Sequence, residues 1–589
     1  MFNLRAAISV VCLGAMMLSA CAGGGGGGAS LPGGTPAGPA TQLAITTQPG
    51  SAVELAPFGI QPVVQVRDAA GILCSSDNST QITAALSGGT GGATLGGMFS
   101  KTAQNGVVTF NNISISVAGS GYTLTFSANP ALTQAATTPF DVAAVSAGGG
   151  SAPFIPAAPA GAATRFVSPT GLDTNNGTSA STPWRTLQKA ADMAQPGDII
   201  DVADGSYARF TIANKGNVPA SPPATQGTPI VFRATGTGAI INSGTSSSTS
   251  PDNRDAIKIT HCNGIIIHGL RTESAFRAGC RIDDCYYVTV QGGVFANGGT
   301  WGIFTDFTDH VQLLGNECYG SKKEHGIYHS NSGDHGIIRG NWCHNNSGSG
   351  IQCNGDGSQV DASMGTRGDG FIEDTLLENN MCSENGGGTQ STPLATSAGG
   401  GAAFNMACAK NNIIRNNLIL NNYASGIAGS DNGLGTQWGS PSNTAYHNTI
   451  YFPAGRGRHC FILKTGSHSW TIKNNICIGG ARGACEFHTD SIPNVTSDFN
   501  VFYSIGGWPL FTNETTSTNY TFAQWKTLFS GDANSQNANA AFTNAAGGDY
   551  SLAAGSPGRD QGTNLGVTGT YDGGTRPQGG APDMGCYER

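Results

Sequence analysis

Charged, polar and aromatic side chains recur at two fixed positions of a segment that repeats between residues 255 and 354. The residue after the second apolar position forms the first series: Lys258, Arg281, Phe304, Tyr328, Gln352 and, beyond an insertion, Phe404. The residue two places further on forms the second series: Thr260, Asp283, Asp306, Ser330 and Asn354. If the segments stack as β-strands, both series become columns on one outward surface, where cations, carboxylates and aromatic rings meet.

Asp283 and Asp306 are expected to be direct neighbours in the second column. Two carboxylates at that distance repel unless they bind a cation, share a proton or pair with Arg281 or Lys258. A Ca²⁺ ion held by Asp283 and Asp306 would neutralise an acidic sugar and acidify its α-proton. The same two aspartates could instead be the acid and the nucleophile or base of a glycoside hydrolase. A solvated salt-bridge ladder is the third interpretation.

An elimination reaction would use four further side chains near this pair. Arg281 or Lys258 would take the proton from the sugar, and Tyr328 or His325 would serve the leaving oxygen. An outward guanidinium at Arg281 could also bind a uronate carboxylate through two hydrogen bonds. We therefore expect Arg281 to contribute to reaction or binding and to matter little for folding.

Contacts with a sugar chain are predicted for five residues. Phe304, Gln352 and Phe404 belong to the outward column, whereas Arg367 and Trp438 lie in two of three insertions that interrupt the repeat. Insertions in repeat proteins often build the wall of a binding face. An indole ring matches the apolar face of a sugar, although packing in the core is an equal alternative for Trp438.

Histidines gather in the segment that spans residues 323–346. Asp309-His310 and Asp334-His335 are adjacent Asp–His pairs one repeat apart, and the tendency of Asp to form turns favours a structural role over catalysis. By the inward–outward alternation His329 is a core histidine. His325 lies next to the outward column, which favours a functional role.

The repeat itself predicts the element that positions these residues. The second apolar positions of the five segments are 23, 23, 24 and 24 residues apart, a period typical of one turn of a β-helix. Asparagines recur at one corner, as expected of stacked amides: Asn316, Asn341, Asn380, Asn417 and Asn475. A column of cysteines, which behave as small buried hydrophobes, follows in the third strand: Cys318, Cys343, Cys382 and Cys477. The predicted fold is an all-β, right-handed parallel β-helix.

The number and spacing of the cysteines predict few disulfide bonds. Of 15 cysteines, thirteen remain once Cys12 leaves with a leader and Cys21 is modified, and an odd number cannot all pair. No CxxC motif of the type that binds zinc occurs. The two stacked pairs Cys262/Cys285 and Cys460/Cys485 are the candidate disulfides.

The N-terminus reads as an export signal, residues 1–20, with Arg5 before a short apolar run. Its last residues, Leu18-Ser19-Ala20-Cys21, resemble the lipobox of bacterial lipoproteins. The resemblance implies lipidation of Cys21, and Ala22 resembles an outer-membrane address in Gram-negative lipoproteins. A Gly-rich linker at 21–40 would then tether an exported protein to the outer membrane.

Short alternating segments with Gly, Asn and Ser turns predict a β-sandwich over residues 41–143. This region resembles the immunoglobulin-like modules of bacterial surface proteins, which implies a spacer. A second linker, rich in Gly, Pro and Ala, spans residues 144–161.

The segment after this linker resembles the opening of the pectate-lyase-like superfamily. A strand, a short helix at Thr186–Ala194, the turn Pro196-Gly197-Asp198 and a strand at Asp204–Tyr207 follow one another. The resemblance implies a β-helix over 162–589, with the short helix capping one end. The Gly579–Gly585 segment resembles a closing signature of secreted β-helix proteins and is expected to cap the other end. Calcium-dependent pectate lyases with this type of N-terminus usually show an acidic "ADGF" stretch with a nearby Lys. This sequence has only Gly368-Asp369-Gly370-Phe371 and lacks that Lys.

Composition restricts the classes of molecule that the protein is expected to bind. A net charge of −8 without basic clusters argues against nucleic acid, and 88 glycines with 11% charged residues suit many tight turns. We expect a monomer that contacts the membrane only through its lipid and acts on a polysaccharide. A polysaccharide lyase, with Ca²⁺ as its candidate cofactor, is the first expectation, ahead of a glycoside hydrolase and an epimerase. A non-catalytic glycan-binding or adhesive protein is the alternative class.

Overall fold

The computed structural model describes residues 37–142, 156–242, 254–387 and 401–589, with short gaps at 51, 53–57, 59, 90–92, 94, 97–98, 111–112, 116, 118, 219–224 and 546–547. The predicted leader, Cys21 and most of the first linker lie outside the described residues. Among the residues that are described, no helix is long and apolar enough to cross a membrane.

The N-terminal region is built from antiparallel sheets. One sheet has the order β1 (Ala40–Thr47), β2 (Val63–Asp68) and β6 (Val107–Thr109). The other has the order β10 (Phe140–Val142), β8 (Gly119–Asn129), β3 (Gln81–Gly88) and β5 (Ser100–Thr102), with β9 (Ala135–Ala136) on β8. β4 (Leu95–Gly96) pairs with β7 (Ser114–Ile115). Alternate residues of β2, β3 and β8, such as Val64, Ile82 and Leu124, are fully buried in a common core, as the alternating sequence predicted. Its immunoglobulin-like character and the predicted boundaries stay predictions.

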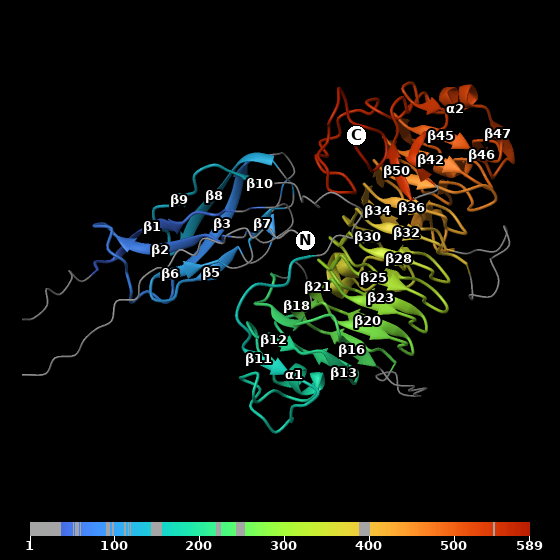
Figure 1. The fold of residues 1–589 in the computed structure, drawn as a ribbon. Coiled ribbons are helices and arrows are strands. Elements are labelled where there is room, and N and C mark those ends of the chain that lie inside the picture. Colours follow the sequence, from blue (N-terminus) through green and yellow to red (C-terminus); the bar gives the residue numbers. More distant parts are fainter. Residues whose placement is uncertain are drawn as a thin grey trace, which may run out of the picture.

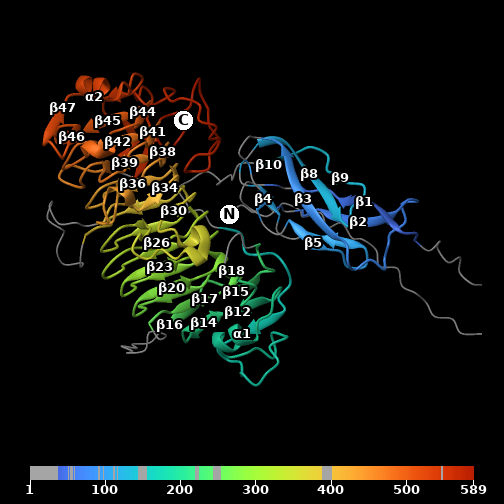
Figure 2. The same ribbon diagram turned by 180° about the vertical axis from the view of Figure 1, so that it is seen from behind.

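The rest of the chain winds into a right-handed parallel β-helix with three long sheets, as Figures 1 and 2 show. Sheet I contains β11 (Arg165–Val167), β12 (Ile199–Val202), β15 (Ile230–Ala234), β18 (Asn263–His268), β21 (Tyr286–Gln291), β24 (Gln312–Leu314), β27 (Ile337–Arg339), β31 (Leu376–Glu378), β35 (Ile413–Arg415), β38 (Thr444–Tyr446), β41 (Thr471–Lys473) and β44 (Thr496–Asp498).

Sheet II follows sheet I in each turn of the coil. Its strands are β13 (Gly205–Tyr207), β16 (Ala239–Asn242), β19 (Arg271–Glu273), β22 (Val294–Ala296), β25 (Glu317–Tyr319), β28 (Trp342–His344), β32 (Met381–Ser383), β36 (Leu418–Leu420), β39 (Thr449–Tyr451), β42 (Ile476–Gly479), β45 (Val501–Ser504) and β48 (Gln536–Asn537).

Sheet III carries the predicted columns. Its strands are β14 (Phe210–Ala213), β17 (Ile257–Thr260), β20 (Ala278–Asp283), β23 (Trp301–Asp306), β26 (Ile327–Ser330), β29 (Ile351–Asn354), β33 (Phe404–Ala407), β37 (Ile427–Ser430), β40 (Phe461–Leu463), β43 (Cys485–Phe487), β46 (Phe511–Asn513) and β47 (Thr518–Tyr520). All neighbours in the three sheets are parallel except β46 and β47. Two-stranded pairs are formed by β30 (Ile372–Glu373) with β34 (Ala409–Lys410) and by β49 (Phe542–Asn544) with β50 (Asp549–Leu552).

Two α-helices cover the ends of the coil (Figure 1). α1 (Leu187–Met193) is capped by the Thr186 hydroxyl, which accepts from the Lys189 backbone at 3.1 Å, and it confirms the predicted helix. At the far end α2 (Phe522–Phe529) buries Trp525, whose ring stacks on Phe511 at 4.2 Å. No α-helix occurs in the described part of 255–475, where the short 3-10 turns η2 (Ala362–Gly368) and η3 (Thr436–Trp438) lie in insertions. A third such turn is η4 (Thr489–Ser491).

The closing segment does not cap the coil as its signature predicted. Cys586 and Tyr587 pack with Leu418 and Leu420 of sheet II, so this segment runs back along the flank of the coil. The cap at that end is α2, whose apolar residues cover the last turn, whereas the closing segment shields apolar side chains that point outward from sheet II.

The predicted asparagine corner is a continuous ladder of buried amides. The Asn380 backbone N–H and side-chain amide donate to the Asn417 side-chain oxygen at 2.8 and 3.1 Å, and the same pattern repeats along the coil. Its members are Asn316, Asn341, Asn380, Asn417, Asn448, Asn475 and Asn500. Each amide also donates to a backbone carbonyl, as Asn417 does to Leu377 at 3.0 Å. The ladder therefore satisfies buried backbone groups at a corner where no sheet can do so.

The cysteine column is also confirmed. Cys318 pairs with Cys343, and Cys343 with Cys382, on the inward side of sheet II. All thirteen cysteines of the described residues are buried free thiols. Both candidate disulfides, Cys262/Cys285 and Cys460/Cys485, are therefore unformed in the structure, although Cys262 N–H points to the Cys285 sulfur at 3.3 Å.

Replacing Asn417 by Ala should destabilise the β-helix. The substitution removes the acceptor of two Asn380 donors in a fully buried corner, and one unsatisfied buried group costs about 1–3 kcal/mol. Denaturant unfolding should show a lower free energy of unfolding for Asn417→Ala, whereas Asn537→Ala, at an exposed position of β48, should change little. Equal effects of the two substitutions would contradict a stabilising role of the ladder.

Candidate functional site

The two predicted columns lie on the outward side of sheet III with the predicted register. In the first column the paired residues are Lys258, Arg281, Phe304, Tyr328 and Gln352. In the second column they are Thr260, Asp283, Asp306, Ser330 and Asn354. The inward positions between them hold fully buried apolar residues such as Ile257 and Ile303. The strand alternation and the repeat period together therefore place these side chains on one face.

Phe404 was assigned to the wrong side of β33. It pairs with Ile351 and is fully buried, while Asn405 continues the outward column beside Gln352. The long insertion before β33 removes the regular spacing, and the apolar ring takes the inward position because burial favours it. The Asn405 amide donates to the Gln352 side-chain oxygen at 2.8 Å, and Gln352 is itself buried.

Arg281 joins the two aspartates into one cluster. Its Nε donates to Asp283 Oδ2 at 2.8 Å and its Nη2 to Asp306 Oδ2 at 3.0 Å. The Asn331 amide donates to the second oxygen of Asp306 at 2.7 Å. The three charged side chains are only 14–19% exposed, so water screens their interactions weakly. Arg281 is therefore an ion-pair partner within the cluster, which is one of the alternatives that the sequence left open for Asp283 and Asp306.

The two carboxyl groups of this cluster have unusual acidity. Burial, followed by the charge of Asp283, raises the pKa of Asp306 to about 6 even though Arg281 opposes the shift. Burial also raises the pKa of Asp283, with Arg281 and Lys258 acting in the opposite sense. A carboxyl group with a pKa near 6 can give or take a proton close to neutral pH. Asp306 thus has the acidity expected of a general acid or base.

Aromatic rings form a wall next to the cluster. The Arg281 guanidinium lies 4.2 Å from the centre of the Phe304 ring, and Phe304 contacts Tyr328 edge to face at 5.2 Å. Trp301 adds a third ring, 4.4 Å from Phe304, and its Nε1 donates to Glu324 at 2.8 Å. The alternation places Trp301 inward, but it is the first residue of β23, at the corner of the coil, where the alternation does not apply. No sequence signal would have identified it.

His325 and Tyr328 are neutral groups of this wall. The Ser349 backbone N–H donates to His325 Nδ1 at 2.9 Å, and burial lowers the pKa of His325 to about 4. The imidazole therefore carries its proton on Nε2, which lies 3.8 Å from a Glu324 oxygen. Burial raises the pKa of Tyr328 to about 12, so its hydroxyl keeps its proton. Both side chains can donate a hydrogen bond, and neither is a base at neutral pH.

The predicted calcium ligands do not form a cation site as they stand. Asp283 and Asp306 both direct oxygens to Arg281, whose guanidinium occupies the position between them that the prediction gave to a metal ion. Calcium binding would require this side chain to move. Across the described residues, no group of three or more His, Cys, Asp or Glu is arranged to hold a metal ion.

The two insertion residues pack into the protein. Arg367 is buried, forms an ion pair with Asp284 and lies 4.4 Å over the Tyr286 ring, so it fastens η2 to the coil and cannot reach a ligand in this arrangement. Trp438 stacks on Phe371 at 5.0 Å and is half-buried, which favours the packing alternative.

The Asp–His turns are structural, as the sequence favoured. Asp309 accepts the Asp334 backbone N–H at 2.9 Å, and Asp334 accepts the Glu373 backbone N–H at the same distance. Burial, followed by the charge of Asp309, raises the pKa of Asp334 to about 9. His329 is fully buried and contacts Thr305 through Nδ1 at 2.7 Å, which confirms its inward position.

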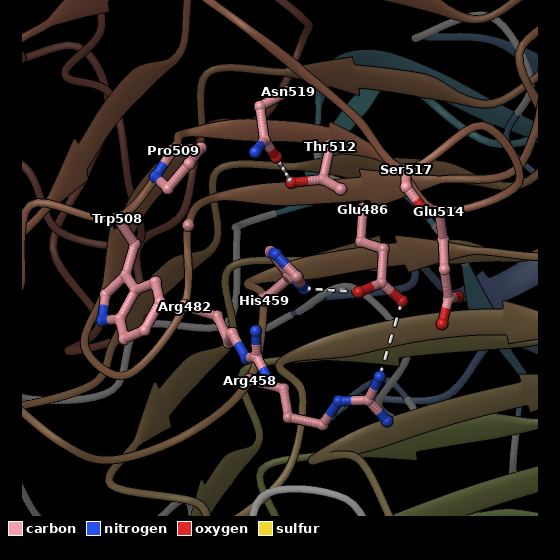
Figure 3. Close-up of a pocket in the computed structure, with 11 residues that line it drawn as sticks. Arg458, His459, Arg482, Glu486, Trp508, Pro509, Thr512, Glu514, Ser517 and Asn519 are labelled. Atoms are coloured by element: carbon pink, nitrogen blue, oxygen red, sulfur yellow. Dashed lines mark hydrogen bonds and ion pairs between the residues drawn. The ribbon is translucent and has the colours of Figure 1, made fainter.

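A pocket of about 380 Å³ lies further along sheet III and was not predicted (Figure 3). β40, β43 and the loop after β45 bring Arg458, His459, Arg482, Glu486 and Trp508 together. These residues are far apart in sequence and lie where insertions have changed the repeat length, so the period used above could not align them.

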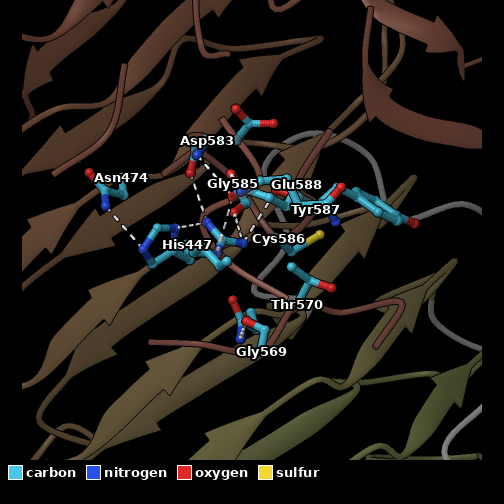
Figure 4. Close-up of polar contacts among 12 residues, drawn as sticks. His447, Asn474, Gly569, Thr570, Asp583, Gly585, Cys586, Tyr587 and Glu588 are labelled. Atoms are coloured by element: carbon cyan, nitrogen blue, oxygen red, sulfur yellow. Dashed lines mark hydrogen bonds and ion pairs between the residues drawn. The ribbon is translucent and has the colours of Figure 1, made fainter. Parts of the chain in front are cut away.

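A second buried polar cluster lies under the closing segment and is structural (Figure 4). Arg576 donates to the backbone carbonyls of Asp583, Gly585 and Tyr587 at 2.7, 3.0 and 3.3 Å, and it also contacts His447. Burial, followed by the charge of Arg576, holds the pKa of His447 well below its usual value. The cluster thus fixes the segment to the coil through one buried cation.

Arg281→Ala should destabilise the protein more at pH 8 than at pH 5. The folded-state pKa of Asp306 is already above its unfolded value, and loss of Arg281 should raise it further. Stability contributed by such a group is lost as pH rises through the folded-state pKa, so the penalty grows with pH. Thermal unfolding at both pH values measures the difference. Arg281→Lys, which retains a cation, should show a smaller dependence, and an equal loss at both pH values would contradict the ion-pair role.

Asp334→Asn should raise the melting temperature at pH 8 but not at pH 4. The folded protein keeps Asp334 protonated far above the unfolded-state pKa, so its stability contribution declines as pH rises toward 9. An amide has no such dependence and can still accept from Glu373. A gain of about 1 kcal/mol corresponds to a shift of about 2–4 °C. The exposed Asp374→Asn serves as the control, and an unchanged or lower melting temperature at pH 8 would refute the prediction.

Comparison with known proteins finds partial matches to one family model and to several solved structures. The family model described as periplasmic copper-binding protein (NosD) matches residues 221–476, less than half of the chain. No curated protein matches the sequence significantly. Solved structures with similar folds include a pectate lyase, with 16% identity, a TM-score of 0.45 and coverage of 73% of this chain and 98% of that chain. A rhamnogalacturonan lyase follows with 15% identity, a TM-score of 0.40 and coverage of 58% and 87%. An alginate lyase from Paenibacillus sp. str. FPU-7 has 16% identity, a TM-score of 0.31 and coverage of 57% and 96%.

The copper named in the family description has no evident site in the described residues. Their cysteines are all buried, and their histidines do not form a cluster of metal ligands with Cys, Asp or Glu. The three parallel sheets, the buried amide ladder and the N-terminal capping helix nevertheless agree with the predicted resemblance. The chain has the fold of a right-handed parallel β-helix.

Proposed function

We propose that this protein is an extracellular enzyme that cleaves a polysaccharide on the outward face of sheet III. The observation that carries the proposal is the Asp306 carboxyl group, held by Arg281 and Asn331 beside Asp283 with a pKa of about 6. Unlike the buried Asp334, this carboxyl group belongs to a row of outward-facing side chains. Its acidity therefore suits a reaction with a bound molecule.

The aromatic wall suits a sugar chain. Trp301 and Tyr328 are partly exposed rings on the same face as the carboxylates, 5.7 Å apart. Sugar rings bury their apolar C–H faces against such rings, while their hydroxyl groups need polar partners. Asp283, Asn331 and the His325 Nε2–H group provide these partners within the same surface.

Hydrolysis by the paired aspartates is the mode of cleavage that the geometry favours. Asp306 would donate a proton to the leaving glycosidic oxygen, and Asp283 would act as the base or nucleophile on the sugar. β-Elimination, the first expectation from the sequence, would require Arg281 or Lys258 to accept a proton. The two ion pairs of Arg281 with carboxylates stabilise its protonated guanidinium and oppose that role. Lys258, next to Arg281 in the column, is the base that an elimination mechanism could still use.

Export and anchoring belong to the same proposal. The leader, the lipobox-like sequence at Cys21 and the Gly-rich linker support a lipoprotein of the outer membrane that acts as a monomer. The described β-helix would then be held away from the membrane by the linkers and the N-terminal sheets.

Asp306→Asn should lower kcat on the cleaved polymer by at least about 100-fold, because general acid–base groups contribute about 10²–10⁴-fold. The amide keeps the size of the carboxyl group but cannot donate the proton. In the unaltered protein kcat should fall as pH rises above about 6, since the acid is then ionised. Asp192→Asn, at an exposed position of α1, should leave turnover unchanged.

The assay should follow reducing ends and ultraviolet absorbance together on a panel of acidic and neutral polysaccharides, with and without chelator. Hydrolysis raises only reducing ends, whereas β-elimination also creates an absorbing unsaturated uronate. New reducing ends without absorbance would support the aspartate mechanism. A rise in both signals would establish elimination instead, and no product from any polymer would favour the non-catalytic, glycan-binding alternative.

A further inference from the structure

The pocket at Trp508 lies on the same column of sheet III as the Arg281 cluster. From Arg281 the paired outward residues lead through Phe304, Tyr328, Gln352, Asn405, Ala428 and Ile462 to Glu486. These are seven strand-to-strand steps of about 4.8 Å, or about 34 Å along the coil. A linear polymer that follows the axis of the coil can therefore meet both places.

The side chains between the two places carry no charge. Gln352 and Asn405 are amides that bond to each other, and Ala428 and Ile462 are apolar. The partly exposed Asn405 and Ala428 can offer a hydrogen bond and an apolar contact to sugar rings, and the row does not repel an acidic chain. The charged groups are concentrated at the two ends of this row.

The pocket combines an exposed aromatic ring with basic side chains. Trp508 is 47% exposed, which is unusual for an indole ring, and the Arg482 guanidinium lies 5.5 Å from its ring centre. Arg458 extends toward Glu486, with which it forms an ion pair, as Figure 3 shows. An aromatic face next to a guanidinium suits a sugar ring that carries a carboxylate.

The acidic residues of the pocket are already paired. Glu486 contacts Arg458 at 3.5 Å, His459 at 3.0 Å and Lys464 at 3.4 Å. Although burial alone would raise it, the hydrogen bond from His459 and the nearby cations hold the pKa of Glu486 well below its ordinary range.

The second acidic residue, Glu514, pairs with Lys464 at 2.8 Å and with His488 at 2.7 Å. Arg482 lines the pocket with an exposed side chain, so its guanidinium is accessible to a bound molecule.

We propose that the Trp508 pocket is a distal subsite that binds an acidic sugar residue of the same polymer that is cleaved at the Arg281 cluster. This inference rests on the proposed function and deepens it, since it assigns the substrate to the acidic polysaccharides. Trp508 would stack on the sugar ring, and Arg482 and Arg458 would face its carboxylate. Simultaneous binding at both ends of the row strengthens the binding of long chains and not of short ones.

The test compares fragments of two lengths in the Asp306→Asn background, where cleavage does not interfere. Polygalacturonate and alginate fragments of about three and about ten sugar residues, and neutral cellulose fragments of the same lengths, are titrated by calorimetry. Trp508→Ala and Arg482→Ala should each weaken binding of the long acidic fragment by about tenfold or more and change that of the short fragment less than twofold. The matched controls Leu528→Ala and Arg185→Ala, at exposed positions elsewhere, should have no effect.

The outcomes separate this inference from the proposed function. If the protein cleaves a polymer but both substitutions leave the affinity for the long fragment unchanged, the subsite is refuted and the enzyme remains. Equal affinity for neutral and acidic long fragments would refute the acidic substrate. If the protein neither cleaves nor binds any fragment, both proposals fail.

Discussion

The structure depends on the in-register stacking of parallel strands, and that stacking depends on satisfying the backbone at the corners of the coil. Within the sheets each strand bonds to the next, but at the asparagine corner the backbone N–H groups of the ladder residues donate to side-chain oxygens and not to carbonyls of the next turn. The amide ladder that includes Asn380 and Asn417 supplies these oxygens, with one side-chain oxygen accepting two donors at every step. Because an orphaned buried N–H costs more than a hydrogen bond contributes, corners tolerate few alternatives to asparagine. Register along the coil follows from this constraint.

Fixed register also determines the chemistry of the outward face. Side chains one repeat apart are brought to one strand spacing, so Asp283 and Asp306 cannot separate to relieve their repulsion. Arg281 offsets part of that repulsion, but burial, together with the remaining repulsion from Asp283, raises the pKa of Asp306 to about 6. A flexible loop would let the carboxylates move apart and lose this effect. The fixed period of the sequence thus leads, through the register of the β-helix, to a carboxyl group with a raised pKa.

The sequence predicted the elements and columns whose period is regular. The spacing of Ile257, Cys280 and Ile303 was sufficient to place Arg281 and Asp283 correctly, because strand alternation leaves only two sides. It failed at Phe404, where an insertion removed the spacing, and at Trp301, which lies at a corner.

Partners of the site residues could not be predicted from the period. The sequence placed Arg281 and the aspartates together but could not tell whether the guanidinium would face them or a ligand. Nor could it show that Arg367 would be buried against Asp284, because an insertion has no repeat to align it. The period of the sequence shows on which side of a strand a residue lies, but only the packed structure shows which residues it contacts.

Two pairs of aspartates one repeat apart show why position decides role. Asp309 and Asp334 stack at a corner, where each accepts a backbone N–H, and burial leaves Asp334 protonated at neutral pH. Like the asparagines of the ladder, these two aspartates accept backbone N–H groups, and they are buried away from any ligand. Asp283 and Asp306 stack on the outward side of a strand, where an arginine and an amide partner them instead of the backbone. Only this second pair lies on the surface and contains a carboxyl group, that of Asp306, with a pKa of about 6, which is the combination that proton transfer to a bound polymer requires.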